Sequence, residues 1–231
     1  MDWNAPCGHS HVKERTMQRR QLLKGIAALA LAERLGALQA AWAAGGKLPP
    51  PGMHQMTGDV RINGQPASPG TPIKPGDTVT TGPNSQAIYI IGNDAYLQRD
   101  RTTVSLAGQA ARAGLRVLTG KLLAVFGKGN KQIETPTATI GIRGTGCYIE
   151  AETKKVYFCL CYGKAEITSM HMPDIHEQLE TSYHDKPVYL HADGSQMMVP
   201  ATVINHTDSE LTLLESLVGR TPAFYGKTSA Y

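Results

Sequence analysis

The 231-residue sequence predicts an all-β fold, an antiparallel sandwich or roll of short strands with one C-terminal amphipathic helix. Three observations support this prediction. From residue 58 onward, short runs rich in β-branched and aromatic residues alternate with turn residues. Two longer runs, 138–151 and 156–162, have strand composition. One stretch, 207–219, carries apolar residues at helical spacing.

The first 43 residues resemble a twin-arginine export signal. Arg19 and Arg20 precede an apolar stretch, and Ala43 ends a small-x-small sequence suited to cleavage. We expect a signal peptide over residues 1–43, with 1–16 upstream of the true start. The alternative is an inner-membrane anchor, but charged residues interrupt the roughly 20 apolar residues that a span requires. The favoured prediction is a periplasmic protein without a stable membrane span after cleavage, and the twin-arginine export machinery is its expected first partner.

The charge balance argues against nucleic acid as a partner. The chain has 23 Lys/Arg and 19 Asp/Glu. Residues 1–43 hold six of the basic and three of the acidic residues, so the remaining chain carries 17 and 16, a net charge of +1. This balance provides no electrostatic footprint for a phosphate backbone. Export also removes the chain from the reducing cytoplasm, so its cysteines could form disulfides.

The elements expected before residue 167 are mostly short strands. Residues 44–57 include consecutive prolines and are expected to form an extended linker. The β domain is expected over residues 58–167, with Asn63 and Gly64 as a two-residue hairpin turn. Strands are expected at 58–62, 78–81, 86–91, 96–101, 115–118 and 121–126. Thr119 and Gly120, between the last two, would form either a hairpin or a strand bend.

A C-terminal extension is expected over residues 168–231. It should contain a hairpin around residues 192–194, followed by a helix over 207–219. Thr207 and Glu210 have the spacing of a capping box, and Gly219 suits the position after a helix C-terminus. We expect this helix to dock on the sheet.

The phrase TPTATIGIRGT, residues 135–145, resembles the signature of the FecR family of periplasmic sensory domains. The resemblance is specific over this phrase and looser over the rest of 58–167. It implies an all-β, non-catalytic domain. Members usually form the periplasmic half of a membrane-spanning regulator of a sigma factor, but too few residues precede the apolar segment here for a sigma-binding domain. The structural motif that the resemblance implies comprises Thr135, Pro136, Arg143, Gly144 and Thr145.

Arg143 interrupts an otherwise apolar strand. A guanidinium buried in such a place needs a carboxylate or carbonyl partner. We therefore expect Arg143 to be a paired structural residue rather than a ligand contact.

Three cysteines that follow the motif allow three interpretations. Cys147, Cys159 and Cys161 could be small buried hydrophobes, or Cys147 could form a disulfide with one of the other two. They could also bind a metal, because three thiolates and one imidazole form a tetrahedral zinc set and soft sulfur also suits copper(I). His184, His191 or His206 could supply the imidazole, and His184 is the preferred candidate.

The length of the turn after residue 151 distinguishes these interpretations. Cys159 and Cys161 are two apart in a strand and share a face. A two-residue turn at 153–154 pairs Cys147 with Leu160 and places it on the opposite face. A three-residue turn places all three cysteines together, and this is the arrangement that we expect.

No sequence motif indicates catalysis, since neither a nucleophile elbow nor a zinc-protease helix is present. The sequence therefore predicts a non-catalytic, FecR-like binding or sensory module of the bacterial periplasm, whose partner is an unidentified envelope protein or small ligand. No cofactor is certain. The alternative is a periplasmic protein that binds a metal or redox cofactor through Cys147, Cys159 and Cys161, with zinc or copper as the metal.

Overall fold

The structure is a computed structural model that describes residues 47–108, 114–193 and 197–226. Every element below belongs to the unit Leu48–Tyr231. Arg19, Arg20 and the expected cleavage site lie outside the described residues, so the export signal stays a prediction. Within the described ranges, no helix is both long and apolar enough to cross a membrane.

Strands dominate the described residues, which confirms the all-β prediction. In chain order the elements are β1 (Gly52–Thr57), β2 (Val60–Ile62), β3 (Gln65–Pro66), β4 (Thr78–Thr81), β5 (Gln86–Ile91), β6 (Asp94–Gln98), β7 (Thr102–Leu106), β8 (Gly114–Val125), β9 (Asn130–Glu134), β10 (Ala138–Ala151), β11 (Lys155–Ser169), β12 (His176–Thr181), β13 (Val188–His191), β14 (Met198–Pro200) and α2 (Asp208–Leu217).

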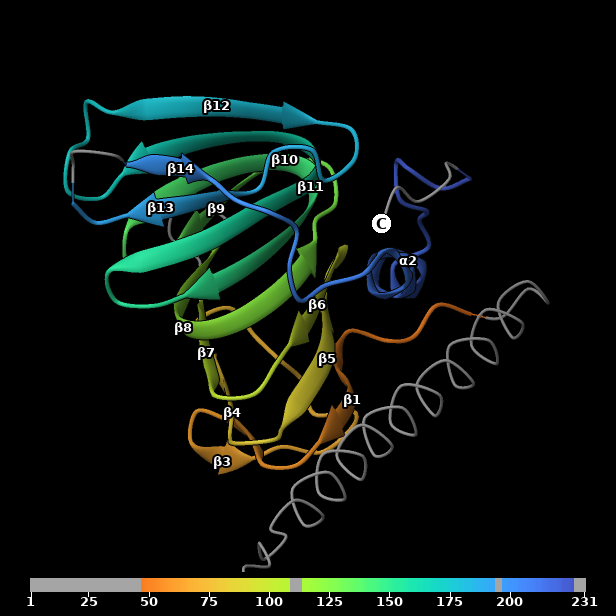
Figure 1. The fold of residues 1–231 in the computed structure, drawn as a ribbon. Coiled ribbons are helices and arrows are strands. Elements are labelled where there is room, and N and C mark those ends of the chain that lie inside the picture. The colour runs from red at the N-terminus through yellow and green to blue at the C-terminus, as the bar shows by residue number, and fades with distance from the viewer. Residues whose placement is uncertain (1–46, 109–113, 194–196, 227–231) are drawn as a thin grey trace, which may run out of the picture. The chain divides into compact units, whose positions relative to one another are not determined.

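The strands form one sheet whose longest path runs β14-β13-β11-β10-β9-β8-β7-β4-β2-β3. Beside this path, β12 pairs with β11, β6 pairs with β8, and β5 joins β6 to β1. The described strand pairs are antiparallel, except that β8 and β9 run parallel. Figure 1 shows the long strands β8, β10 and β11 curving past one another, with α2 beside β6.

The long strands change partners along their length, and this rolls the sheet. The first part of β10 pairs with β9 and its second part pairs with β8, with an irregular register between Arg143 and Gly146. Gly144 has a φ of 58° at this bulge, a conformation that glycine adopts without steric cost. Strand β11 likewise pairs with β13 at its start and with β12 at its end.

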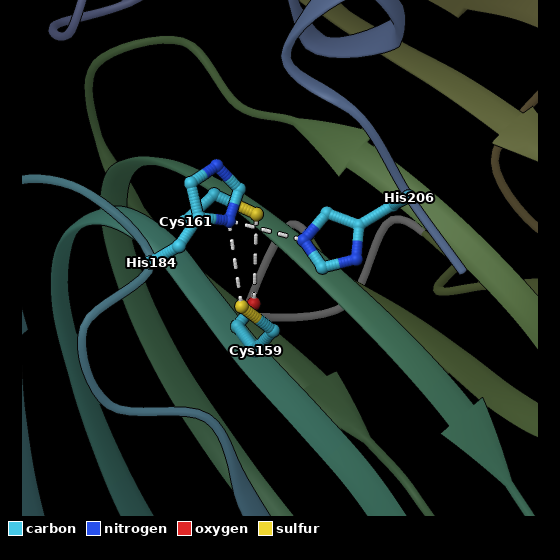
Figure 2. A group of neighbouring side chains, drawn as sticks. All are labelled: Cys159, Cys161, His184 and His206. Atoms are coloured by element: carbon cyan, nitrogen blue, oxygen red, sulfur yellow. Dashed lines mark hydrogen bonds between the residues drawn. The ribbon is translucent and has the colours of Figure 1, made fainter. Parts of the chain in front are cut away.

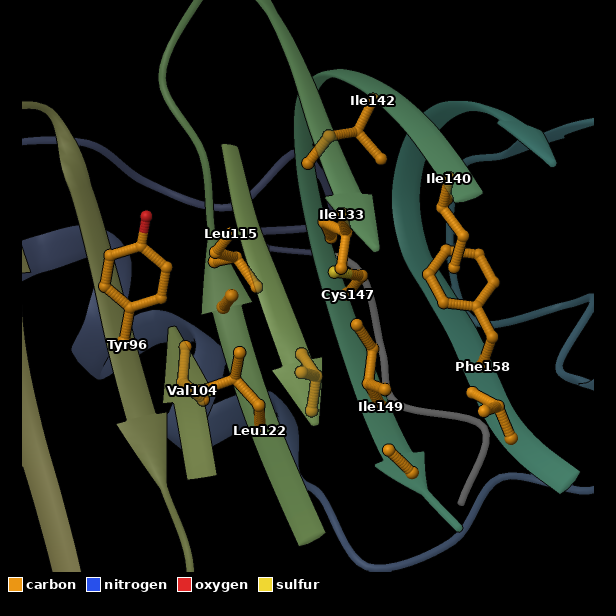
Figure 3. Close-up of a cluster of buried hydrophobic side chains, with 14 of the residues drawn as sticks. Tyr96, Val104, Leu115, Leu122, Ile133, Ile140, Ile142, Cys147, Ile149 and Phe158 are labelled. Carbon is orange, nitrogen blue, oxygen red and sulfur yellow. The ribbon is translucent and has the colours of Figure 1, made fainter. Parts of the chain in front are cut away.

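Side chains on one side of the rolled sheet form a continuous apolar core, here called the inner face. Alternate residues of β10 and β11 enter it, because successive side chains in a strand point to opposite sides. Figure 3 shows Cys147, Ile149 and Phe158 packed there with Leu122 and Ile140. These five side chains are completely buried. The opposite side of β10 and β11, here called the outer face, carries the candidate site.

Several predicted boundaries need correction. Residues 52–57, expected to be part of the linker, form β1, because their backbone pairs with that of β5. Of the two alternatives for Thr119 and Gly120, the strand bend is confirmed: residues 115–118 and 121–125 are parts of one strand, β8, that bends at Gly120, where φ is 90°. The residues after 167 do not form a separate extension, because β11 continues to Ser169 and β12 pairs with it.

The hairpin and helix predicted near the C-terminus are confirmed. Strands β13 and β14 pair antiparallel. Helix α2 begins after Thr207, whose side chain accepts from the Glu210 N–H while the Glu210 side chain accepts from the Thr207 N–H, the predicted capping box. Gly219 has a φ of 70°, as expected just beyond a helix C-terminus.

Candidate metal centre

The turn between β10 and β11 decides which way the cysteines face. Glu152 and Lys155 are joined by a 3.0 Å backbone hydrogen bond, so the turn holds only residues 153 and 154. Cys147 therefore pairs with Leu160, and its side chain lies in the inner face. The expectation of a three-residue turn with all three cysteines on one face is wrong. Two-residue turns match the twist of antiparallel strands best, and a shift of one residue reverses every side chain.

Cys147 is thus separated from the other two cysteines by the sheet itself. It is fully buried among apolar side chains, and desolvation raises the pKa of its thiol. A disulfide from Cys147 to Cys159 or Cys161 does not fit this register, because the side chains point to opposite faces. Cys147 is therefore a small core residue, and the metal candidates are Cys159 and Cys161.

His184 lies in the loop between β12 and β13. Its backbone N–H donates to the Cys161 carbonyl at 3.0 Å, which ties the loop to β11. Its φ of 45° is in the left-handed region, where non-glycine residues are uncommon. Its Nδ1 lies 3.7 Å from Cys159 Sγ, and its Nε2 lies 3.2 Å from Asp208 Oδ1. The loop therefore directs one ring nitrogen at sulfur and the other at a carboxylate.

His206 comes from the segment just before α2. Its ring stacks on Tyr148 of β10, with centroids 4.7 Å apart and planes 22° apart. Its Nδ1 lies 2.6 Å from the Ile204 carbonyl, and its Nε2 lies 3.1 Å from His184 Nδ1. The capping box at Thr207 fixes the backbone immediately after it. His206 is held from three sides, with Nε2 directed at the cysteines.

Figure 2 shows the four side chains converging on the outer face, and we call Cys159, Cys161, His184 and His206 the Cys2His2 cluster. Their ligand atoms, two sulfurs and two nitrogens, all lie within 4.8 Å of one another. All four residues are buried. The cluster joins β11, the β12–β13 loop and the segment before α2.

The outward-facing contacts of the two imidazoles indicate which ring nitrogen of each carries the proton. The Ile204 carbonyl only accepts, so His206 Nδ1 carries a proton and, in the neutral ring, Nε2 has a lone pair. The Asp208 carboxylate likewise favours a proton on His184 Nε2, although the alignment is poorer than in a regular hydrogen bond, and leaves a lone pair on Nδ1. Either a proton or a metal ion between these two nitrogens, 3.1 Å apart, would satisfy both of them.

The thiols differ in their acidity. The adjacent Cys161 thiol lowers the pKa of Cys159 most, and His184 and His206 lower it further, while burial acts in the opposite direction. Burial raises the pKa of Cys161, and the neighbouring Cys159 raises it further. Burial thus opposes ionisation of both thiols. A bound metal ion would offset this cost, because both sulfurs could bind it as thiolates.

The ligand set and its surroundings would suit a tetrahedral metal centre. Two thiolates and two imidazoles are a standard structural zinc set. Metal-bound histidines usually donate their other N–H to a carboxylate or a backbone carbonyl. Asp208 and the Ile204 carbonyl occupy those positions. Tyr183 in turn donates to Asp208 at 2.6 Å and holds the carboxylate in place.

Cysteine catalysis is the competing chemistry, because Cys159, His184 and Asp208 have the order of a nucleophile, a base and an orienting acid. Cys159 is completely buried and His184 is 3% exposed, so a substrate has no path to the sulfur. A groove over β9–β12 is lined by Lys131, Arg143 and other polar residues, but by no member of the Cys2His2 cluster. Burial therefore favours metal binding.

The residues of the FecR-like motif lie apart from the cluster, at the start and middle of β10. Thr135 closes the β9–β10 turn, since its hydroxyl donates to the Ala138 carbonyl at 2.8 Å. Arg143 is exposed, so the expectation that it would need a buried partner is wrong. Gly144 forms the bulge and Thr145 is buried beside it, while Pro136 lies in the turn and is half-buried.

The sequence suggested most of the cluster but not its final composition. Cys159, Cys161 and His184 were predicted, and His206 was one of the two less favoured histidines. His191, the other one, lies on β13, opposite Lys155. A signal for His206 was its position directly before a capping box, which fixes its backbone.

Comparisons with known proteins give only a distant structural likeness. No family model matches the sequence, and no curated protein matches it. Two crystal structures of a protein described as a putative anti-sigma factor from Parabacteroides distasonis resemble part of the chain, each with 10% identity and a TM-score of 0.45. Each match covers 54% of this chain and 59% of that chain, so this chain spans about three-fifths of that protein. A likeness this distant identifies neither family nor function, and the FecR resemblance stays a prediction.

Proposed function

We propose that this protein is an exported, non-catalytic β domain that holds one zinc ion in the Cys2His2 cluster. The observation that carries the proposal is the pair of imidazole nitrogens, His184 Nδ1 and His206 Nε2, that face each other at 3.1 Å beside two buried thiols. A proton between the rings would satisfy the nitrogens alone. A metal ion accounts for both nitrogens and both sulfurs at once.

The zinc has a structural role in this proposal. A structural zinc has four protein ligands, whereas a catalytic zinc keeps one position open for water or substrate. The cluster supplies four ligands and is buried on all sides. The metal joins three segments that are distant in the sequence, so its binding free energy contributes directly to the stability of the folded state.

The wider role is that of a periplasmic binding or sensory module, exported by the twin-arginine machinery. This route carries folded proteins, so a metal inserted in the cytoplasm would travel with the domain. The role rests on the signal-like N-terminus and the FecR-like phrase at residues 135–145. The partner would be an envelope protein or a small ligand.

Metal analysis of protein purified from the periplasm tests the proposal. We expect about one equivalent of zinc per chain. His206→Ala should lose the metal, and His191→Ala, a histidine outside the cluster, should retain it. Stoichiometric copper with no zinc would correct the identity of the metal to copper(I), which the two soft thiolates also suit.

The reactivity of the thiols provides a second test of metal binding. In the native zinc-loaded protein, Cys159 and Cys161 should be protected from alkylation, and a chelator should expose them. Protein that binds none of zinc, copper(I) or iron, and whose thiols react identically with and without chelator, would refute the proposal.

A further inference from the structure

Beyond holding a metal, the cluster is placed to control whether the C-terminal part of the chain stays attached to the sheet. Residues 201–226, here called the C-terminal segment, contain α2, which contacts β6 and β8, and reach the outer face at Thr202 and His206. His206 belongs to this segment, and so does Asp208, which orients His184. The two cysteines and His184 belong to the remainder of the domain. The cluster therefore exists only when the segment is docked.

The segment packs separately from the main core. Its buried apolar side chains, Leu211, Leu214, Leu217 and Phe224, do not belong to the core cluster of the inner face. They lie on the other side of the sheet, over a layer that includes Tyr162, whose ring meets Phe224 edge-on. The segment can therefore detach without opening the inner core.

The segment makes several polar contacts with the rest of the domain. Arg220 donates to the Asn93 carbonyl at 2.6 Å, and the buried Tyr162 hydroxyl donates to Glu215 of α2. Arg99 donates to the Asn205 carbonyl at 2.7 Å and pairs with Glu210 at 2.9 Å. Tyr157 donates to the Thr202 carbonyl at 3.0 Å. The exposed contacts contribute little, because water competes for both partners. The buried Tyr162–Glu215 hydrogen bond and the apolar side chains of α2 hold the segment without metal, and a metal bound only in the docked state adds to them.

Without metal, the docked arrangement crowds buried polar atoms together. His184 Nδ1 lies 3.1 Å from His206 Nε2 and 3.7 Å from Cys159 Sγ, in a site closed to water. Detachment moves His206 away and lets water solvate these atoms. With metal bound, the same four groups favour docking.

Resting on the proposed function, we propose that metal occupancy of the Cys2His2 cluster switches the C-terminal segment between a docked and a detached state. A ligand that binds only the docked state increases its population by a factor of one plus the ratio of free metal to Kd. Free zinc at ten times Kd multiplies the docked-to-detached ratio by about 11. Detachment uncovers the aromatic outer face, including Tyr148 and Tyr157.

Hydrogen exchange followed by mass spectrometry tests the switch in the full exported chain, with zinc and with chelator. We compare protein in chelator with protein at free zinc ten times Kd. Amides of α2 should exchange about tenfold faster in chelator. Amides of β8 and of the β10–β11 pair should change little. His206→Ala should exchange quickly in both conditions, and His191→Ala should respond like the unaltered protein.

A second variant tests docking without touching a ligand. Arg99→Ala removes contacts to Asn205 and Glu210, so it should speed exchange of α2 in both conditions and still respond to zinc. Stoichiometric zinc binding with unchanged exchange of α2 would overturn the switch and leave the proposed function standing. Equal slowing of exchange across all strands would also overturn it. Absence of zinc binding would overturn both proposals.

Discussion

The two faces of β10 and β11 use the same residue type for different purposes. On the inner face, Cys147 is a small apolar side chain among isoleucines and leucines, remote from any ligand partner. On the outer face, Cys159 and Cys161 meet two histidines that are held by their own hydrogen bonds. All three cysteines are completely buried. Burial alone therefore does not distinguish a core thiol from a candidate metal ligand.

The difference arises from strand register and from what covers each face. A shift of one residue in the pairing would exchange the two sets of side chains. The inner face is covered by other strands of the same rolled sheet, whose side chains are apolar. The outer face is covered by a loop and a helix, which bring polar side chains from distant parts of the chain. The following predictions compare the two faces.

The largest effect should follow loss of a cysteine on the outer face. At free zinc 1,000 times Kd, bound zinc should stabilise the unaltered protein by about 4 kcal/mol relative to chelator. Cys161→Ala should abolish that zinc-dependent stabilisation. In chelator, the substitution should lower the free energy of unfolding by only about 1 kcal/mol, a typical value for one substitution. Denaturant unfolding in zinc and in chelator measures both values. An undiminished zinc effect in the variant would exclude Cys161 as a ligand.

A smaller effect should follow from loosening a ligand without removing it. Asp208→Asn weakens the acceptor that orients His184, and such outer partners typically contribute 10–100-fold to metal affinity. Competition with a chromogenic chelator should report that loss, with zinc still bound one to one. Asp185→Asn, next to the same histidine in sequence, is the control. Equal affinity in the Asp208 and Asp185 variants would show that Asp208 does not support the site.

Loss of the inner-face cysteine should affect stability but not metal. Cys147→Ala leaves a small cavity among apolar side chains, and we expect a cost of about 1 kcal/mol, the same in zinc and in chelator. Zinc stoichiometry and affinity should be unchanged. Loss of zinc from this variant would contradict the separation of the two faces.

The smallest effect concerns a buried carboxyl of α2, in the C-terminal segment. Burial raises the pKa of Glu215 above 4.5, although its contacts with Tyr162 and Arg220 act in the opposite direction. The folded state therefore prefers the protonated form. The corresponding stability is complete below about pH 4.5 and is lost as pH rises through the folded-state pKa.

Glu215→Gln should remove this dependence. In zinc-free protein, we expect the free energy of unfolding of the unaltered chain, minus that of the variant, to fall as pH rises from about 4. Denaturant titrations across this range provide the measurement. A difference that rises with pH would mean that Arg220 outweighs burial.

Elements specified by local sequence were predictable. The strands at 78–81, 86–91 and 138–151 appear as expected, because each is rich in β-branched residues and is bounded by turn residues. The helix after Thr207 was equally clear, because a capping box and apolar spacing coincide there. These signals act over a few residues and need no tertiary contact.

Features that depend on distant partners could not be predicted. Residues 52–57 form a strand only because β5 offers an edge, and the preceding prolines hid this. His206 comes close to Cys159 only through the path of the chain after β14, which no local pattern encodes. The side of the sheet on which Cys147 lies depended on one residue of turn length, and Thr153 and Lys154 carry no strong turn signal.

X-ray absorption at the zinc edge tests the central claim most directly. For the zinc-loaded chain, we predict two sulfur ligands at about 2.3 Å and two nitrogen ligands at about 2.0–2.1 Å. Cys147→Ala should give the same shell, since Cys147 lies on the inner face. A shell with three sulfurs that loses one in Cys147→Ala, or a shell of nitrogen and oxygen alone, would contradict the account.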